Sequence, residues 1–304
     1  MGVSTTWVGG TSSDWATAGN WTNGLPGTTG TAVIDGSVSI TGGTPSGNAE
    51  VERVYVASTY TGAIGSSGTP LELDVAEMSV DNNSSGSAHY IHLTGSNNTT
   101  PTVMVDGLKV GNALYLSGDL DLVVVEDTFL GFMYLGNSAS KVAAIKDLVI
   151  KTTSGTIDAS TPANVAWVAS ATVDMTSGTL NLGENIGDGG KLYMSGGTIN
   201  VSEWTKVGTT DEFILQGGTV NWNAGSTGLT PSSVNAFWIM KIIGGTFTTA
   251  ANEKAYVGLG AITQFGGTLN LQSSFANIDI NTAYNSYAGT FIYPKQSVIT
   301  TTAK

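Results

Sequence analysis

The chain has 304 residues, of which 40% are hydrophobic and only 11% are charged, and its formal net charge is -12 at pH 7. This apolar content excludes a disordered chain. The single arginine, Arg53, argues against a nucleic-acid binder, because neutralising phosphates requires clustered basic side chains.

The N-terminal segment, residues 1–45, is marked by three tryptophans, Trp7, Trp15 and Trp21. Two interpretations are open: the indole rings close the end of the fold that follows, or they form an exposed site for attachment or for stacking on sugar rings. The segment lacks the basic and long apolar regions of a secretory signal, and no stretch of the chain reaches the ~18 apolar residues of a membrane span. We therefore expect no membrane insertion, and two alternatives stay open: a signal has been removed, or the protein is made in a cytoplasm and carried elsewhere.

Residues 60–100 have no clear assignment from the sequence, because "DNNSSGSAHYIHLTGSNNTTP" indicates loops between short strands. It contains the only two histidines of the chain, His89 and His92. A strand would place side chains three residues apart on opposite faces. No metal site and no nucleophilic triad is therefore predicted here.

Two carboxylates, Asp119 and Asp121, lie in "LYLSGDLDLV" at alternate positions. A strand would place them on one face about 7 Å apart, which suits the paired acids of a glycoside hydrolase. They also occupy positions where a repeat found further along the chain has Thr and Asn, so solvated polar residues are expected there without catalysis. The second interpretation is favoured, and no catalytic residue is assigned.

The second half of the chain repeats the pattern Gly-Thr-apolar, as in "SGGTINV" and "QGGTVNW". Successive threonines are separated by 19 to 27 residues, with a mean of about 22, and a period in this range is typical of a solenoid. No segment has the 3.6-residue period of an amphipathic helix. The threonines of the pattern are Thr156, Thr179, Thr198, Thr219, Thr246, Thr268 and Thr290.

Strand alternation explains the composition of each repeat. In "TINV", Ile199 and Val201 would face one way, while Thr198 and Asn200 would face the other. Stacked in parallel, such strands bury a continuous apolar core and expose ladders of Thr and Asn, and the preceding Gly-Gly supplies a bend that residues with a Cβ resist. We predict an all-β fold, a parallel β-helix of about 22 residues per coil over residues 46–304 with a Trp-rich N-terminal cap.

The repeat "LYMSGGTINV" resembles the β-strand repeats of bacterial autotransporter passengers and, more broadly, the β-helices of phage spike and decoration proteins. The opening "TWVGGTSSDWATAGNWTNGLPGTTGTAVIDG" resembles the segment that precedes such repeats in many large secreted proteins. A virion protein needs no secretory signal and no disulfides. The resemblance therefore implies a phage particle component.

From these observations we expect a non-enzymatic structural protein of a phage particle, a capsid decoration or spike protein on the virion surface. Its partners would be the major capsid protein or other virion proteins, and solenoid edges favour a homotrimer. Two alternatives stay open: a tail receptor-binding spike that binds or cleaves surface polysaccharide, and a fragment of a bacterial adhesin at the cell surface. No cofactor, metal or nucleic acid is expected.

Overall fold

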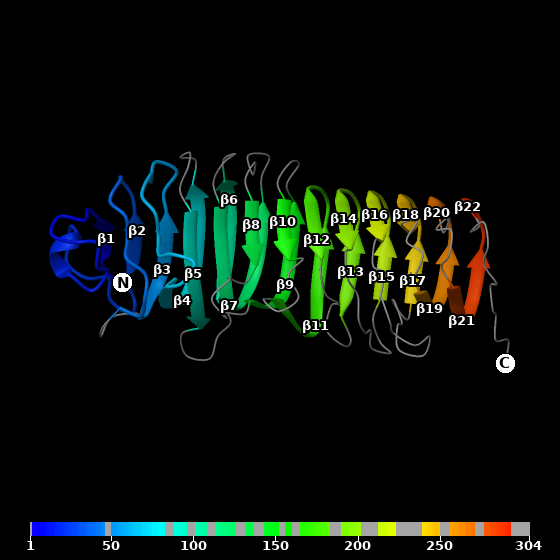
Figure 1. The fold of residues 1–304 in the computed structure, drawn as a ribbon, viewed down its shortest axis with the longest axis horizontal. Helices are drawn as coiled ribbons and strands as arrows, with labels where there is room; N and C mark the ends of the chain where they lie inside the picture. The colour runs from blue at the N-terminus through cyan, green and yellow to red at the C-terminus, as the bar shows by residue number, and fades with distance from the viewer. Residues whose placement is uncertain are drawn as a thin grey trace. The chain divides into compact units, whose positions relative to one another are not determined.

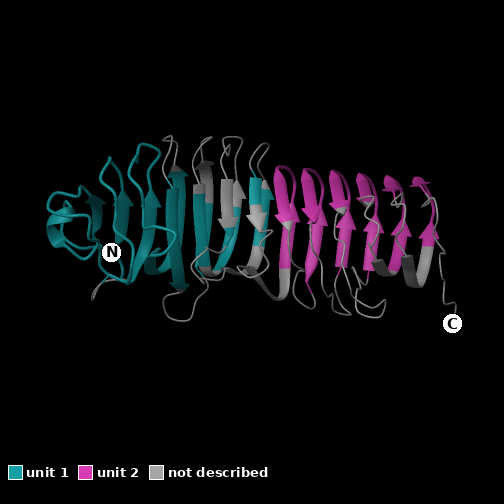
Figure 2. Cartoon of the chain, in the orientation of Figure 1, with its two compact units in different colours: residues 1–158, 163–166 teal, residues 159–162, 167–304 magenta. Residues whose placement is uncertain are grey.

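We describe a computed structural model of the chain. It describes residues 2–45, 50–82, 88–95, 101–108, 113–125, 132–135, 143–151, 156–159, 165–182, 190–201, 212–222, 239–249, 256–270 and 277–292. The chain forms two compact units (Figure 2). Unit 1 comprises residues 1–158 and 163–166, and unit 2 comprises residues 159–162 and 167–304. The cap boundary expected between residues 45 and 46 stays a prediction.

Unit 1 is a parallel β-solenoid (Figure 1). Its strands are β1 (Ser4–Trp7), β2 (Thr31–Ile34), β3 (Glu50–Val56), β4 (Leu71–Asn82), β5 (Ala88–Gly95), β6 (Thr102–Leu108), β7 (Ala113–Val125), β8 (Phe132–Leu135), β9 (Ala143–Lys151) and most of β10 (Thr156–Ala159). One parallel ladder runs β1, β2, β3, β4, β6, β7 and β9. A second runs β4, β5, β7, β8 and β10, so β4 and β7 belong to both.

Helical structure in the described residues is limited to one short 3-10 helix. The 3-10 helix η1 (Ala18–Asn20) lies in the Trp-rich segment beside β1. Among the described residues, no helix is long and apolar enough to cross a membrane.

Unit 2 repeats a pair of short strands. Its strands are most of β11 (Val165–Met175), β12 (Thr179–Leu182), β13 (Lys191–Met194), β14 (Thr198–Val201), β15 (Glu212–Leu215), β16 (Thr219–Trp222), β17 (Ile239–Ile242), β18 (Thr246–Thr249), β19 (Tyr256–Gln264), β20 (Thr268–Asn270), β21 (Asn277–Ser286) and β22 (Thr290–Ile292). The odd-numbered strands pair in one parallel ladder and the even-numbered strands in another (Figure 1).

The register of the even-numbered ladder confirms the sequence repeat. The threonines of six successive repeats, from Thr179 to Thr290, are paired one above the next. In β14, Ile199 and Val201 are buried, whereas Thr198 and Asn200 are partly exposed. The predicted alternation of core and outer positions is therefore confirmed.

Glycine is needed at the two positions of the Gly-Gly pair for different reasons, which Gly217 and Gly218 illustrate. Gly218 has a φ of 79°, which residues with a Cβ rarely adopt. Gly217 lies so close to the preceding coil that a Cβ would meet the carbonyl oxygen of Ser195 at 2.3 Å. The first glycine allows close stacking of the coils, and the second allows the turn.

Asparagine side chains form part of the predicted outer ladder. Asn200 Nδ2 donates to Asn181 Oδ1 at 2.9 Å, and Asn221 Nδ2 donates to Asn200 Oδ1 at the same distance. The next strand has Thr248 at this position, where no amide continues the row. The amides therefore reinforce three successive coils.

Replacing Asn200 by Ala should lower the free energy of unfolding by about 1–2 kcal/mol, because two side-chain hydrogen bonds are lost at a partly buried position. Asn181→Ala removes only one of these two bonds, so about half that effect is expected. Urea denaturation followed by far-UV circular dichroism compares the two variants. Equal losses would contradict the ladder as the source of the effect.

The structure assigns two strands within residues 60–100, which the sequence left without a clear assignment. The structure has a twelve-residue strand, β4, and an eight-residue strand, β5, within this range. Buried Leu71, Leu73 and Leu93 supply the apolar positions of these strands. The Asn- and Ser-rich sequence between β4 and β5 obscured this pattern.

Candidate functional site

A groove lies on the outer face of unit 1, across strands β2, β3, β4 and β6. It has a volume of about 360 Å³, within the range of small-ligand pockets. The lining combines hydroxyl, charged and apolar side chains: Thr31, Arg53, Val54, Tyr55, Glu77, Met78, Ser79, Thr102 and Met104.

Strand register explains why these residues meet. Thr31, Arg53, Glu77 and Thr102 are paired in one row across the four strands. The row two residues further along has Val33, Tyr55, Ser79 and Met104. Residues two apart on a strand point to the same face, so both rows face outward from the sheet.

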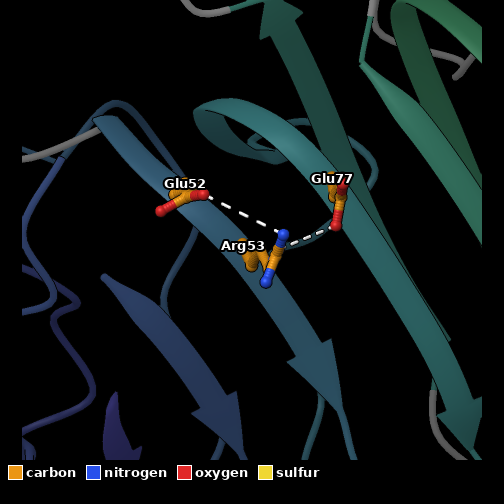
Figure 3. Close-up of polar contacts among 3 residues, drawn as sticks. All are labelled: Glu52, Arg53 and Glu77. Carbon is orange, nitrogen blue, oxygen red and sulfur yellow. Dashed lines mark ion pairs between the residues drawn. The ribbon is translucent and has the colours of Figure 1, made fainter. Parts of the chain in front are cut away.

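The first row holds an ion pair (Figure 3). Arg53 Nε lies 2.8 Å from Glu77 Oε2, and Arg53 Nη2 lies 4.0 Å from Glu52 Oε1. The side chains of Arg53 and Glu77 are 54% and 59% exposed, so the pair contributes at most about 1 kcal/mol to stability. Their exposed hydrogen-bonding atoms face the groove.

The second row supplies the walls. The Tyr55 hydroxyl donates to Asp81 Oδ2 at 3.3 Å, which holds the phenol ring on the sheet surface. Met104 is 42% exposed. Ser79 lies between them in register, so a small side chain separates two large ones. The groove is the notch that this size difference leaves.

The three tryptophans of the N-terminal segment do not line this groove. Trp7, Trp15 and Trp21 are 1%, 0% and 4% exposed. Trp21 packs edge-on against both other rings, at centroid distances of 5.2 and 4.7 Å. The rings form the Trp-rich cap of the solenoid, and such burial leaves little ring face for sugar stacking. Their role in attachment stays a prediction.

Hydrogen bonds fix the cap. Trp7 Nε1 donates to the carbonyl of Val38, and Trp21 Nε1 donates to the carbonyl of Trp15. Buried Asn20 accepts from the backbone N–H groups of Thr11 and Ser12 through its Oδ1. Trp15 Nε1 is buried without a hydrogen-bond partner among the described residues.

The aspartate pair predicted as an alternative acid site is only partly described. Asp121 lies on β7 between buried Leu120 and Leu122 and is paired with Thr102. It therefore occupies an outer position, as the alignment with the Thr-Asn repeat predicts. The side chain of Asp119 lies outside the described residues, so the separation of the two carboxylates is not tested.

The two histidines lie on opposite faces of β5, as predicted. His89 is buried, and its ring centroid lies 5.7 Å from that of Tyr60. His92 faces outward, where its Nδ1 is 3.0 Å from Ser117 Oγ. Within the described part of the chain, no group of three or more His, Asp or Glu residues is placed to hold a metal ion.

Burial gives His89 a pH-dependent effect on stability, because it lowers the pKa of this side chain to about 4. Between pH 6.5 and 4 the unfolded chain binds a proton at His89 that the folded chain does not, so stability falls as the pH falls. We expect His89 to account for a loss of about 2 kcal/mol between pH 7 and 5.

Urea titrations at the two pH values measure this effect. His89→Phe keeps a buried ring and removes the proton site, so the change of stability with pH should be about 2 kcal/mol smaller in this variant. An identical change in the variant and the wild type would contradict the assignment.

An exposed apolar row lies on unit 2, at the position directly before the turn of each coil, which is Gly-Gly after Ile243 and Phe265 and Ala288-Gly289 after Tyr287. Ile243, Phe265 and Tyr287 occupy this position in three successive coils and are 46%, 50% and 73% exposed. The rings of Phe265 and Tyr287 stack at 5.3 Å with an interplanar angle of 7°. Ser195 and Gln216 occupy the same position in the two preceding coils, so the row is confined to the later part of the unit.

Comparison with protein-family models, with curated proteins and with solved structures found no match to this chain. The function proposed below therefore rests on the fold and on the surfaces of the described residues. The resemblance to autotransporter repeats and to phage spikes stays a prediction beyond the solenoid fold itself.

Sequence reasoning missed the groove. Its members come from four coils of the first half of the chain, and none of them belongs to the Gly-Thr repeats of the second half. One signal was available: Arg53 is the single arginine of the chain, and Glu77 follows it after about one coil length. A lone cation with a carboxylate one coil later indicates an ion pair on the outer face of a solenoid.

Proposed function

We propose that this protein is a non-enzymatic structural protein that acts by stable binding, and that it serves as a decoration or spike protein on the surface of a phage particle. The observation that supports a structural role is the regular register of unit 2. Backbone pairing and stacked asparagine amides hold the outer side chains in fixed rows on successive coils. A surface fixed in this way loses little conformational entropy on binding.

The exposed row of Ile243, Phe265 and Tyr287 supports attachment through unit 2. Three large apolar side chains in register form a continuous stripe, and aromatic rings contribute much of the binding free energy at protein interfaces. The occupant that we propose is a shell protein of the particle.

Cryo-electron microscopy of the particle from which the chain comes tests the location. Many copies in a regular arrangement on the capsid are expected for a decoration protein. A few copies at a tail tip would instead support a receptor-binding spike, and absence from any particle would leave the adhesin alternative.

The attachment surface can be tested by sedimentation with purified particles stripped of this protein. Phe265→Ser with Tyr287→Ser should weaken binding at least tenfold, because the stacked pair is the aromatic part of the proposed contact. Thr6→Ser, a partly exposed position on β1 of unit 1, serves as the control and should bind as the wild type does. Unchanged binding of the double variant would exclude this surface.

A receptor-binding spike is the second candidate. The groove on unit 1 favours it, because the groove combines an aromatic ring with several polar side chains.

A further inference from the structure

The notch above Ser79 has dimensions that follow from the sheet. Neighbouring strands lie about 4.8 Å apart, so Tyr55 and Met104, one strand to either side of Ser79, have backbones about 10 Å apart. Their side chains line the groove of about 360 Å³, which we call the slot and which is large enough for a ring-sized group. Arg53 and Glu77 lie at one side of the slot, two residues back along β3 and β4.

The slot is apolar on its walls and polar at its side. The phenol ring of Tyr55 and the thioether of Met104 offer C–H and π contacts, whereas Arg53 donates and Glu77 accepts hydrogen bonds. Thr31 and Thr102 add hydroxyl groups to the charged row. A ligand that fits must therefore be a ring with apolar faces and hydroxyls around its edge.

Charge restricts the ligand further. Arg53 pairs with Glu77 at 2.8 Å and lies 4.0 Å from Glu52, and the chain as a whole has a net charge of -12. An anionic ligand would compete with Glu77 for Arg53 against this excess of negative charge, and a cationic ligand would compete with Arg53 for Glu77. A neutral ligand leaves the ion pair in place and hydrogen-bonds to both partners.

We propose that this notch binds one neutral hexopyranose unit of a glycan. The C–H face of the sugar packs against Tyr55, the opposite side contacts Met104, and ring hydroxyls bind Arg53 and Glu77. A single sugar unit in a shallow groove binds weakly, with a Kd on the order of 1–10 mM. The site does not depend on the attachment role proposed above, since it lies on unit 1.

Methionine-methyl NMR tests the site directly. The full chain carries seven methionines, and labelling their methyl groups with carbon-13 gives few signals. Met104→Leu assigns the Met104 signal, and buried Met240 in unit 2 is the internal control. The probes are maltotriose and cellotriose as neutral glycans, with glucuronic acid and glucosamine as charged comparators.

Both neutral trisaccharides are titrated to several times the expected Kd. We expect at least one to shift the Met104 methyl signal and to leave the Met240 signal unchanged. The two charged sugars should bind at least threefold more weakly, as measured from the Met104 signal. No shift of the Met104 signal with either neutral trisaccharide, or tighter binding of a charged sugar, would overturn the proposal.

Ser79→Ile fills the notch with a side chain that strands accommodate well, and it should weaken the trisaccharide at least tenfold. Thr263→Ile places the same side chain at a partly exposed strand position of unit 2 and should leave the Kd unchanged. Met104→Ala is the second groove variant. It removes one wall of the groove, so the trisaccharide should bind at least threefold more weakly. Binding to this variant is measured from the intrinsic fluorescence of the protein.

Two further outcomes would reject the site. Wild-type affinity in both Ser79→Ile and Met104→Ala would place the sugar elsewhere. A Met104 signal that moves with protein concentration in the absence of sugar would assign the groove to contact with a second copy of the chain.

Discussion

Replacing Gly218 by Ala should lower the free energy of unfolding by about 2–5 kcal/mol. The left-handed backbone costs a residue with a Cβ about 1–2 kcal/mol, and crowding adds about 1–3 kcal/mol. The crowding arises because a Cβ at this position would lie 2.6 Å from the carbonyl oxygen of Gly197 and 2.6 Å from the Met194 methyl carbon. Urea denaturation followed by far-UV circular dichroism measures the loss.

Two glycines in unit 1 serve as controls that separate the cost of backbone strain from the cost of steric crowding. Gly36 has a φ of 85° and open space around its Cβ position, so Gly36→Ala should show the strain alone, about 1 kcal/mol. Gly27 has open space and no positive φ, and Gly27→Ala should change stability by less than about 0.5 kcal/mol. If Gly218→Ala costs no more than Gly36→Ala, the close stacking of coils does not limit this position.

Replacing Trp21 by Ala should destabilise the protein by about 3–5 kcal/mol, because a large buried ring is lost and a cavity remains. Trp21 is the central ring of the cap, in contact with both Trp7 and Trp15. Thermal unfolding followed by near-UV circular dichroism detects the loss in the environment of the remaining rings. A loss below about 1 kcal/mol would contradict the cap as a source of stability.

Phenylalanine substitutions give a matched pair within the cap. Trp21→Phe removes an indole N–H that donates to the Trp15 carbonyl at 2.8 Å, whereas Trp15→Phe removes an N–H with no hydrogen-bond partner among the described residues. Both reduce ring volume equally. Trp15→Phe should therefore be the less costly variant, by about 2 kcal/mol, because it removes an unsatisfied donor. The reverse order would contradict the hydrogen-bond assignment.

The sequence by itself determined the fold of unit 2. Each repeat contains the residues that determine its own structure. Alternate apolar residues such as Ile199 and Val201 define the inner face, and Gly217 with Gly218 defines the bend. Because each repeat carries the same Gly-Thr-apolar pattern, pairing Thr198 with Thr219 follows from alignment alone. The outer position of Asn200, and hence the asparagine ladder, follows from the same alternation.

Only the tertiary structure decided the surfaces. Thr31, Arg53, Glu77 and Thr102 are separated by between 22 and 25 residues, and none of them belongs to the Gly-Thr repeats of the second half of the chain. The sequence therefore does not fix which residues stack, because alternation excludes a shift of one residue but not a shift of two, which keeps the same side chains facing outward. The groove exists because backbone pairing in unit 1 brings small Ser79 between Tyr55 and Met104.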